Sequence, residues 1–431
     1  MLISFAVTNY ACFKDRQELT LVPPRKTDDD EFSFDTGVPR VPRLHRAAAL
    51  YGANASGKSR LIQALAFVDS FVIGSSARRQ TGEPIPHEPF RFDAECRARP
   101  TTFEISFVQA GSLYEYGFAV DGERVQEEWL LQWPAGGRQR MLLDREHDPA
   151  TGEESWTFGA SVRGEKRAWQ ASTRPDTLLV STAAQLNSEV FAPVVEWFQR
   201  TLRVVSTGGL LLPAGTIAMI DGNERATDRV LKMLRDADIA VSSLRTRKES
   251  IGLDDLRPSP PAVMLREFRE AGHTTLNLWE ADLGHRPEGC SETFFLDLDE
   301  ESDGTQRLFA LAGPWLSVLD NDLVVVVDEL DSSMHSHLTE ALIRRINSRP
   351  LGGEDRRSQL VATLHDTSPM KGALDRDQIW LVDKDAATEA SSLTPLSAFR
   401  PRRREPLDRG YLGGRYGGVP VIAEYGPASI R

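Results

Sequence analysis

The sequence predicts an α/β fold with a buried central sheet, a β-rich lobe and a helical insertion. Two short runs of apolar and aromatic residues, Ala47–Tyr51 and Leu323–Val327, have the composition of strands that are buried on both faces. Each run leads directly into a loop of unusual composition, glycine-rich after the first and acidic after the second, and a helical pattern follows each loop. Between the two runs, apolar and polar residues alternate over residues 101–133, which predicts antiparallel strands.

The overall composition limits the possible functions. The chain has 431 residues and a formal net charge of −12, so no overall positive field draws it toward nucleic acid. One local basic run is either a DNA contact or an ordinary solvated turn: Arg400, Arg402, Arg403 and Arg404. The three cysteines lack metal-ligand spacing, which fits a reducing cytoplasm. There is no secretory leader pattern and no apolar run of about 18 residues, so we expect a cytoplasmic protein without a membrane segment.

Local patterns define the elements of the first half of the chain. Leu2–Val7 and Glu18–Val22 read as a strand pair, and the polar, proline-bearing residues 23–42 read as a surface loop. After Lys58, apolar residues recur at helical spacing, and Ser188–Leu202 also has a helical pattern. Together with strands between residues 101 and 179, these elements predict that residues 1–209 form the N-terminal part of the main domain, or head.

The second half is expected to contain an insertion and then the rest of the head. Residues 210–289 are weakly patterned, with one clear amphipathic helix at Ala226–Ala240 and a charged, irregular stretch at 244–261, and they predict a helical insertion lobe. The lobe lacks the sustained heptads of a long coiled coil. Residues 290–431 return to alternating strands and helices. The expected strands are 294–298, 323–327, 359–364 and 378–383, and the expected helices are 306–319 and 336–345.

The glycine-rich loop has the spacing of a phosphate-binding P-loop, Gly-x-x-x-x-Gly-Lys-Ser, between a strand and a helix. Its backbone N–H groups and the helix N-terminus would surround phosphate oxygens. Lys58 would reach the β- and γ-phosphates, and the Ser59 hydroxyl would hold Mg²⁺. We therefore expect ATP and Mg²⁺ as ligands. The nucleotide-binding candidates in this loop are Gly52, Asn54, Ala55, Ser56, Gly57, Lys58, Ser59 and Arg60.

The acidic pair Asp328 and Glu329 follows the second apolar strand. Such a strand places its last residues at the carboxyl edge of the sheet, where Asp328 could join the Mg²⁺ shell. Glu329, one residue further, is placed to polarise the water that attacks the γ-phosphate. A valine-rich strand that ends in two acids is common in proteins. Because the chain also contains a P-loop, we interpret this pair as part of the same nucleotide site.

Two further segments fit an ABC-type ATPase head, which hydrolyses ATP when two heads close face to face. Ser302, Gly304 and Gln306 lie at a helix start shortly before the acidic pair, and in a closed dimer they would contact the γ-phosphate of the partner head. An ordinary N-cap explains the same pattern. His365, at the end of the strand after the acidic pair, is expected to contact γ-phosphate as a catalytic switch. Asp331 is either part of the head–head interface or a solvated loop acid.

These motifs resemble one known family. Tyr51–Ser59, Glu301–Arg307, Asp328–Ser333 and Thr363–Thr367 are similar to segments of the AbiLi/RloA-type abortive-infection ATPases, which are AAA/ABC-type proteins related to OLD and SMC heads. The tail Tyr411–Pro420 resembles the C-terminus of that family. The resemblance implies bacterial antiphage defence and a partner encoded beside the gene, usually an RloB-type or TOPRIM-like protein. Too few residues follow His365 for the TOPRIM nuclease domain of an OLD protein, so any nuclease is expected in the partner.

Three functions are compatible with the sequence. The first is a defence ATPase that dimerises on ATP and controls an effector. The second is a DNA-end or gap-binding repair ATPase similar to SMC or RecF heads, against which the acidic charge argues weakly, so DNA contact stays possible. The third is a scaffold that binds ATP without turnover, and the presence of Glu329 argues against it. Asn9 and Phe13 are candidates for the adenine end of the site.

Overall fold

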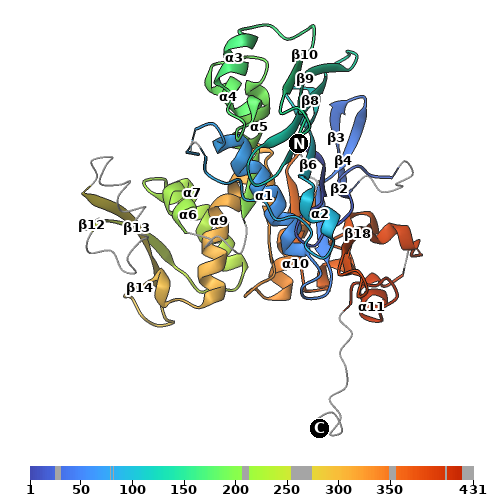
Figure 1. The fold of residues 1–431 in the computed structure, drawn as a ribbon. Coiled ribbons are helices and arrows are strands. Elements are labelled where there is room, and N and C mark those ends of the chain that lie inside the picture. The colour runs from blue at the N-terminus through green and yellow to red at the C-terminus, as the bar shows by residue number, and fades with distance from the viewer. Residues whose placement is uncertain are drawn as a thin grey trace, which may run out of the picture. The chain divides into compact units, whose positions relative to one another are not determined.

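The computed structural model divides the chain into two units, which Figure 1 traces from blue to red. The first consists of Met1–Gly209 and Val318–Arg431, and the second of Leu210–Ser317. The second unit begins where the insertion was expected but extends beyond residue 289, because the strand after that residue pairs with an earlier strand of the same unit. The described residues are 1–24, 31–77, 79–80, 82–205, 213–253, 274–348, 356–402 and 405–419.

A six-stranded central sheet forms the base of the first unit. Its strands, in spatial order, are β11 (Leu202–Val205), β15 (Val324–Val327), β16 (Gln359–Thr363), β5 (Ala47–Tyr51), β17 (Ile379–Lys384) and β18 (Ser391–Pro395). All neighbours run parallel except the last pair, which is antiparallel. The apolar runs that predicted β5 and β15 are fully buried, which confirms them as central strands.

A seven-stranded antiparallel sheet forms the β-rich lobe, as the alternation over 101–133 predicted. Its spatial order is β10 (Glu154–Phe158), β9 (Arg140–His147), β8 (Val125–Trp133), β7 (Ser112–Val120), β6 (Thr101–Gln109), β1 (Leu2–Thr8) and β2 (Gln17–Thr20). The loop expected at residues 23–42 is wrong in part. β3 (Ser33–Val38) and β4 (Val41–His45) form a hairpin whose Phe34 and Leu44 are fully buried, while residues 25–30 of that loop lie outside the described residues.

Helices cover both sheets of the first unit. The helix expected after Lys58 is α1 (Lys58–Gly74), and its Phe71 ring lies 5.6 Å from the Phe118 ring of the β-rich sheet. Trp197 stacks on Phe107 of β6 with ring centroids 4.4 Å apart. The remaining α-helices of this unit are α2 (Ala94–Ala98), α3 (Lys166–Ser172), α4 (Leu179–Gln185), α5 (Ala192–Arg200), α10 (Ser336–Asn347) and α11 (Leu407–Leu412).

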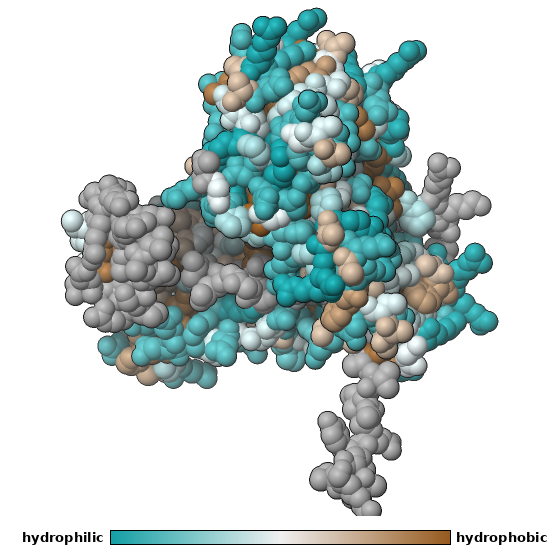
Figure 2. Space-filling view, in the orientation of Figure 1, coloured by the Kyte–Doolittle hydropathy of each residue, from teal (hydrophilic) through white to brown (hydrophobic). Residues whose placement is uncertain are grey.

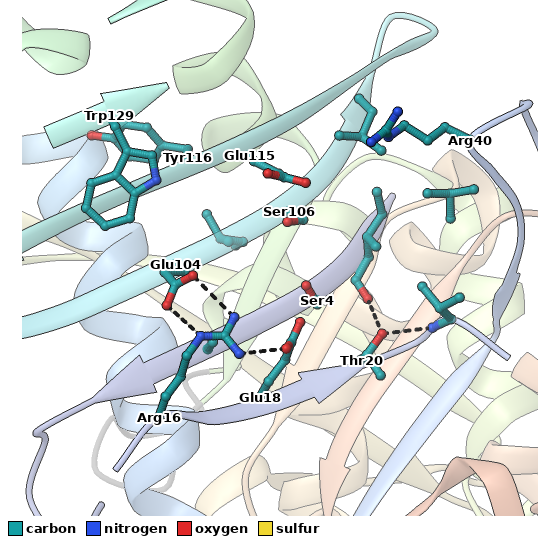
Figure 3. Close-up of a pocket in the computed structure, with 16 residues that line it drawn as sticks. Ser4, Arg16, Glu18, Thr20, Arg40, Glu104, Ser106, Glu115, Tyr116 and Trp129 are labelled. Carbon is teal, nitrogen blue, oxygen red and sulfur yellow. Dashed lines mark hydrogen bonds and ion pairs between the residues drawn. The ribbon is translucent and has the colours of Figure 1, made fainter. Parts of the chain in front are cut away.

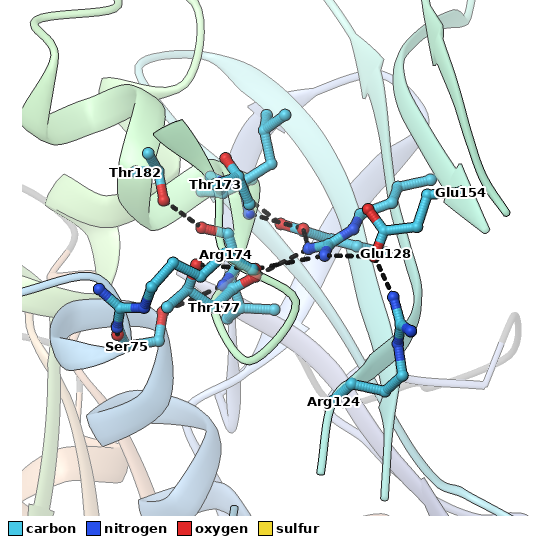
Figure 4. Close-up of polar contacts among 12 residues, drawn as sticks. Ser75, Arg124, Glu128, Glu154, Thr173, Arg174, Thr177 and Thr182 are labelled. Atoms are coloured by element: carbon cyan, nitrogen blue, oxygen red, sulfur yellow. Dashed lines mark hydrogen bonds and ion pairs between the residues drawn. The ribbon is translucent and has the colours of Figure 1, made fainter. Parts of the chain in front are cut away.

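A buried carboxylate joins the β-rich sheet to the helical layer (Figure 4). Glu128 of β8 is fully buried and accepts hydrogen bonds from the backbone N–H groups of Leu179 and Val180, at 2.7 and 3.0 Å. The N-cap residue of α4 supplies no side-chain bond, so Glu128 satisfies these two donors from outside the helix. The Arg145 guanidinium lies 3.6 Å from the same carboxylate and balances its charge.

The second unit is mixed rather than helical. Its described α-helices are α6 (Ala214–Ile220), α7 (Glu224–Asp236) and α9 (Asp303–Asn321), which ends in the first unit. Its described strands are β12 (Ser243–Gly252), β13 (Thr275–His285) and β14 (Phe294–Asp297). The stretch that was expected to be irregular contains β12, which pairs antiparallel with β13. Residues 254–261 of that stretch lie outside the described residues. Among the described helices, none combines the length and apolarity needed to cross a bilayer.

The face of the molecule in Figure 2 is mainly hydrophilic, with apolar residues scattered over it. A groove of about 430 Å³ lies on the β-rich sheet of the first unit, lined by residues of β1, β2, β4, β6, β7 and β8 (Figure 3). Arg16 crosses it and pairs with Glu104 at 2.8 Å and with Glu18 at 2.7 Å. None of the residues predicted to bind nucleotide lines this groove.

Candidate functional site

The predicted nucleotide motifs of the first unit meet at one edge of the central sheet. β15, β16 and β5 are adjacent and parallel, so the loops after Val327, Thr363 and Tyr51 emerge at the same edge. A pocket of about 560 Å³ opens there. It is lined by Cys12, Asn54, Ala55, Ser56, Gly57, Lys58, Ser59, Arg60, Glu329 and His365.

The glycine loop needs its glycines for steric reasons. Gly57 has φ of +113°, and a Cβ atom there would lie 2.6 Å from the Cys12 sulfur. Gly52 does not line the pocket, but a Cβ atom on it would lie 2.3 Å from the Val382 carbonyl oxygen. Both distances are far below van der Waals contact, so any larger residue would displace the loop or its neighbours.

Lys58 is folded back onto the loop. Its Nζ donates to the carbonyl oxygens of Gly52 and Ala53, at 2.8 and 3.1 Å, and the residue is only 5% exposed. Burial lowers the pKa of Lys58, whereas Asp328 and Glu329 act in the opposite direction. The ammonium group therefore sits among neutral carbonyls with acids nearby, a setting in which a phosphate would be a better partner.

Asp328 and Ser59 form an oxygen pair suited to Mg²⁺. The Ser59 hydroxyl donates to Asp328 Oδ1 at 3.0 Å, and Asp328 is 2% exposed. The Thr363 hydroxyl donates to the same Oδ1 at 2.7 Å and fixes the carboxylate. Among the described residues no group of three or more His, Cys, Asp or Glu side chains could hold a metal ion. One carboxylate and one hydroxyl fit Mg²⁺, which in such sites takes its other ligands from water and phosphate.

Glu329 and His365 line the same pocket from neighbouring loops. Glu329 has φ of +51°, a left-handed conformation that is uncommon for a non-glycine residue. Its backbone N–H donates to the Thr363 hydroxyl at 2.6 Å, which helps to hold that conformation. Asp331 Oδ2 accepts the N–H groups of His365 and Asp366 at 2.6 and 2.5 Å, so Asp331 ties the loop after β15 to the loop after β16.

The predicted signature residues belong to the second unit. Ser302 precedes α9 and acts as its N-cap, because its hydroxyl accepts the Thr305 N–H at 3.3 Å. Gly304 is the second residue of that helix, and Gln306 Nε2 donates to the Glu301 carbonyl at 2.8 Å. This geometry is that of an ordinary helix start. The expected contact of Ser302, Gly304 and Gln306 with a partner's nucleotide stays a prediction.

The sequence did not reveal two residues of the site, and two of its candidates do not line the pocket. Cys12 lines the pocket, but the residues around it in the sequence show no pattern that predicts this. The fold brings it next to Gly57, which is distant in the sequence. Thr363 lies in the segment Thr363–Thr367, which carries part of the family resemblance, but the sequence predicted no role for Thr363 itself. Asn9 and Phe13 do not line the pocket: Phe13 is fully buried, and the Asn9 amide donates to the carbonyls of Cys96 and Arg99 at 2.8 and 2.9 Å.

The basic run is only partly described. Arg400 has φ of +51° and ends a short 3-10 helix, whereas Arg403 and Arg404 lie outside the described residues. The described part therefore forms a turn, and a contact with DNA stays a prediction.

Comparison with known protein families identifies one whose model matches the chain. The model of a family described as "AAA domain, putative AbiEii toxin, Type IV TA system" matches residues 47–194 and 236–368. No curated protein matches the chain.

Several solved structures are similar to the chain. An SMC head bound to the C-winged helix domain of ScpA is 13% identical and has a TM-score of 0.40, covering 91% of this chain and 96% of its own. The SMC head domain from Thermotoga maritima is 13% identical with a TM-score of 0.38, covering 91% and 98%. The recombination mediator RecF with ATP is 12% identical with a TM-score of 0.32, covering 91% and 97%.

Proposed function

The chain belongs to the family described as "AAA domain, putative AbiEii toxin, Type IV TA system", and it is a P-loop ATPase with an α/β head. From this premise we propose that it is the ATPase of a bacterial antiphage system of the AbiLi/RloA type. It would act as a switch that dimerises on ATP and controls a partner effector. The observation that carries the proposal is the meeting of Lys58, Ser59, Glu329 and His365 in one pocket, with Asp331 linking two of its loops.

Each residue of the pocket has a defined task in this proposal. Lys58 would exchange its two carbonyl partners for the β- and γ-phosphates, which accept stronger, charge-assisted hydrogen bonds than neutral carbonyls do. Ser59 and Asp328 would hold Mg²⁺, which neutralises developing phosphate charge when bound. Glu329 would orient and polarise the attacking water.

The coupling of the two loops supports a switch. His365 would sense the γ-phosphate, and its backbone N–H is bonded to Asp331, whose loop also carries Glu329. A displacement of the His365 loop on nucleotide binding would therefore move the Asp331 carboxylate, and with it the loop expected at the head–head interface. The partner head would complete the site with Ser302, Gly304 and Gln306 from its signature helix.

The solution mass of Glu329→Gln, measured by light scattering with and without Mg-ATP, tests the switch. Slow hydrolysis should trap the nucleotide, so ATP should double the mass. Adding Lys58→Ala to the same variant should abolish the doubling, because the phosphate partner is lost. A mass that ignores ATP, while bound nucleotide is detected by filtration, would contradict an ATP-driven dimer.

The defence role is tested in cells. Lys58→Ala should abolish protection against phage, whereas Lys232→Ala, at an exposed lysine of α7, should leave it intact. Protection that survives Lys58→Ala would contradict the role. We infer that the effector is an RloB-type or TOPRIM-like protein encoded next to this chain. Copurification with that neighbour would support the inference, and ATP-dependent binding of a DNA duplex without any such partner would favour a repair ATPase instead.

A further inference from the structure

The C-terminal segment of the first unit contacts the start of the P-loop. Residues 405–419, which we call the strap, contain α11 and the glycine-rich turn that follows it. The strap has no role in the function proposed above. The strap is well packed, since Tyr411 is 6% and Tyr416 is 2% exposed.

The outer end of the strap is held by its own side chains. Tyr416 donates its hydroxyl to Glu405 Oε1 at 2.8 Å, and Arg415 pairs with the same carboxylate. A Cβ atom on Gly410 would lie 2.6 Å from the Tyr416 hydroxyl, so the helix and the turn are in close contact. These contacts give the strap a fixed shape.

The inner end rests on Tyr51 and Gly52, where β5 passes into the P-loop. The Tyr411 ring meets the fully buried Tyr51 ring edge to face, with centroids 5.8 Å apart. The Tyr411 hydroxyl donates to the Gly418 carbonyl at 3.0 Å and closes the turn. Burial raises the pKa of Tyr411, and the nearby Asp383 carboxylate raises it further.

Two glycines allow this close approach. Gly418 has φ of +69°, and a Cβ atom there would lie 3.7 Å from Gly52 Cα, so Gly418 lies about one methyl group away from Gly52. Gly417 has φ of +75°, and a Cβ atom there would lie 3.1 Å from an Asp383 carboxylate oxygen. Side chains are disfavoured at both positions by the left-handed conformation, and at Gly417 also by space.

The geometry points to the strap as a positioning element of the nucleotide site, which fixes Gly52 through Tyr411 and Gly418 and so sets the affinity for ATP. Gly52 is the residue through which the strap can act, because its carbonyl oxygen holds Lys58 Nζ at 2.8 Å. A shifted Gly52 would misplace both Lys58 and the first N–H groups of the phosphate cradle. The effect should fall on ATP binding, since Glu329 and His365 lie on the loops after β15 and β16 and not on the loop after β5.

Tyr411→Phe tests this directly, because it keeps the ring against Tyr51 and removes only the hydroxyl. We expect the Kd and KM for ATP to rise about fivefold with kcat within about twofold of the wild type, as the loss of the one neutral hydrogen bond between Tyr411 and Gly418 implies. Gly418→Ala should raise both constants further. Binding is measured with a fluorescent ATP analogue, so the result does not depend on dimerisation or on a defence role.

The matched control is Tyr114→Phe in β7, which removes a buried hydroxyl that accepts from Gln132 Nε2 at 2.9 Å, away from the pocket. It should lower Tm by a similar amount and leave ATP affinity unchanged. If Tyr411→Phe and Gly418→Ala lower Tm but bind ATP like the wild type, the strap is only structural and the inference is overturned. A fall in kcat with unchanged KM would overturn it as well. If Gly418→Ala does not fold, Tyr411→Phe alone decides.

Discussion

Thr363→Val is the substitution that most directly tests the geometry of the site. The Thr363 hydroxyl is fully buried and makes one bond in each direction: it donates to Asp328 Oδ1 at 2.7 Å and accepts the Glu329 N–H at 2.6 Å. Valine keeps the shape and loses both bonds. The loss of a bond to a charged acceptor, together with the loss of this acceptor for the partly buried Glu329 N–H, costs about 3 kcal/mol in the free energy of unfolding.

The same change should slow hydrolysis. The left-handed backbone of Glu329 costs on the order of 1 kcal/mol and persists only where its surroundings hold it. The Thr363 hydroxyl is one of the contacts that hold this backbone, so its loss should weaken the orientation of Glu329 toward the pocket. We expect kcat to fall about tenfold or more, which corresponds to about 1.4 kcal/mol in the activation free energy, and KM to change less.

Urea unfolding and steady-state ATP hydrolysis measure the two effects. Thr363→Ser is the control, because it keeps the hydroxyl and loses only a methyl group, at a cost of about 1 kcal/mol. It should retain kcat close to the wild type. If Thr363→Val has the kcat of Thr363→Ser, the bond to the Glu329 N–H does not position Glu329, and the reasoning is wrong.

Three further predictions concern stability. Glu128→Ala should lower the free energy of unfolding by about 3 kcal/mol in urea titrations, because it leaves the buried Arg145 with Glu154 as its remaining carboxylate partner and removes the acceptor of the Leu179 and Val180 N–H groups. Burial lowers the pKa of His45 to about 4, so as the pH falls the unfolded chain binds a proton before the folded chain does. The free energy of unfolding should therefore fall between pH 6.5 and pH 4, and His45→Leu should flatten this pH dependence in Tm measurements. Burial raises the pKa of Asp69 to about 7, so the folded chain keeps this carboxyl protonated, and the resulting contribution to stability is lost as the pH rises through 7. Asp69→Asn should therefore raise Tm at pH 8 and have little effect at pH 4.

The sequence predicted those parts of the site that are local in the chain. The P-loop spacing, the valine strand Val324–Val327 and the acids after it are consecutive residues, and each carries its own pattern. Contacts that arise from the fold carry no such pattern. Cys12 meets Gly57 only because the loop after β1 returns to the sheet edge, and Thr363 meets the Glu329 N–H only because β16 lies beside β15.

The fold was predicted least well where strands lie in small sheets. The β3–β4 hairpin contains Pro42 and Gly37, which favour a turn by local propensity, and its burial of Phe34 outweighs them. β12 is rich in charged residues and belongs to a three-stranded sheet, where alternation of apolar residues is weak. Propensity therefore failed where pairing with distant residues decides the structure.

The order of the central sheet explains why the site depends on the whole first unit. β5, which carries the P-loop, comes early in the chain, yet it lies between β16 and β17 from the late part. The early segment alone would leave β5 without either neighbour, and the late segment alone would leave a gap between β16 and β17. The affinity for nucleotide therefore depends on both segments being assembled in one sheet. The strap, which comes last in the described chain and lies against Gly52, is part of the same assembly.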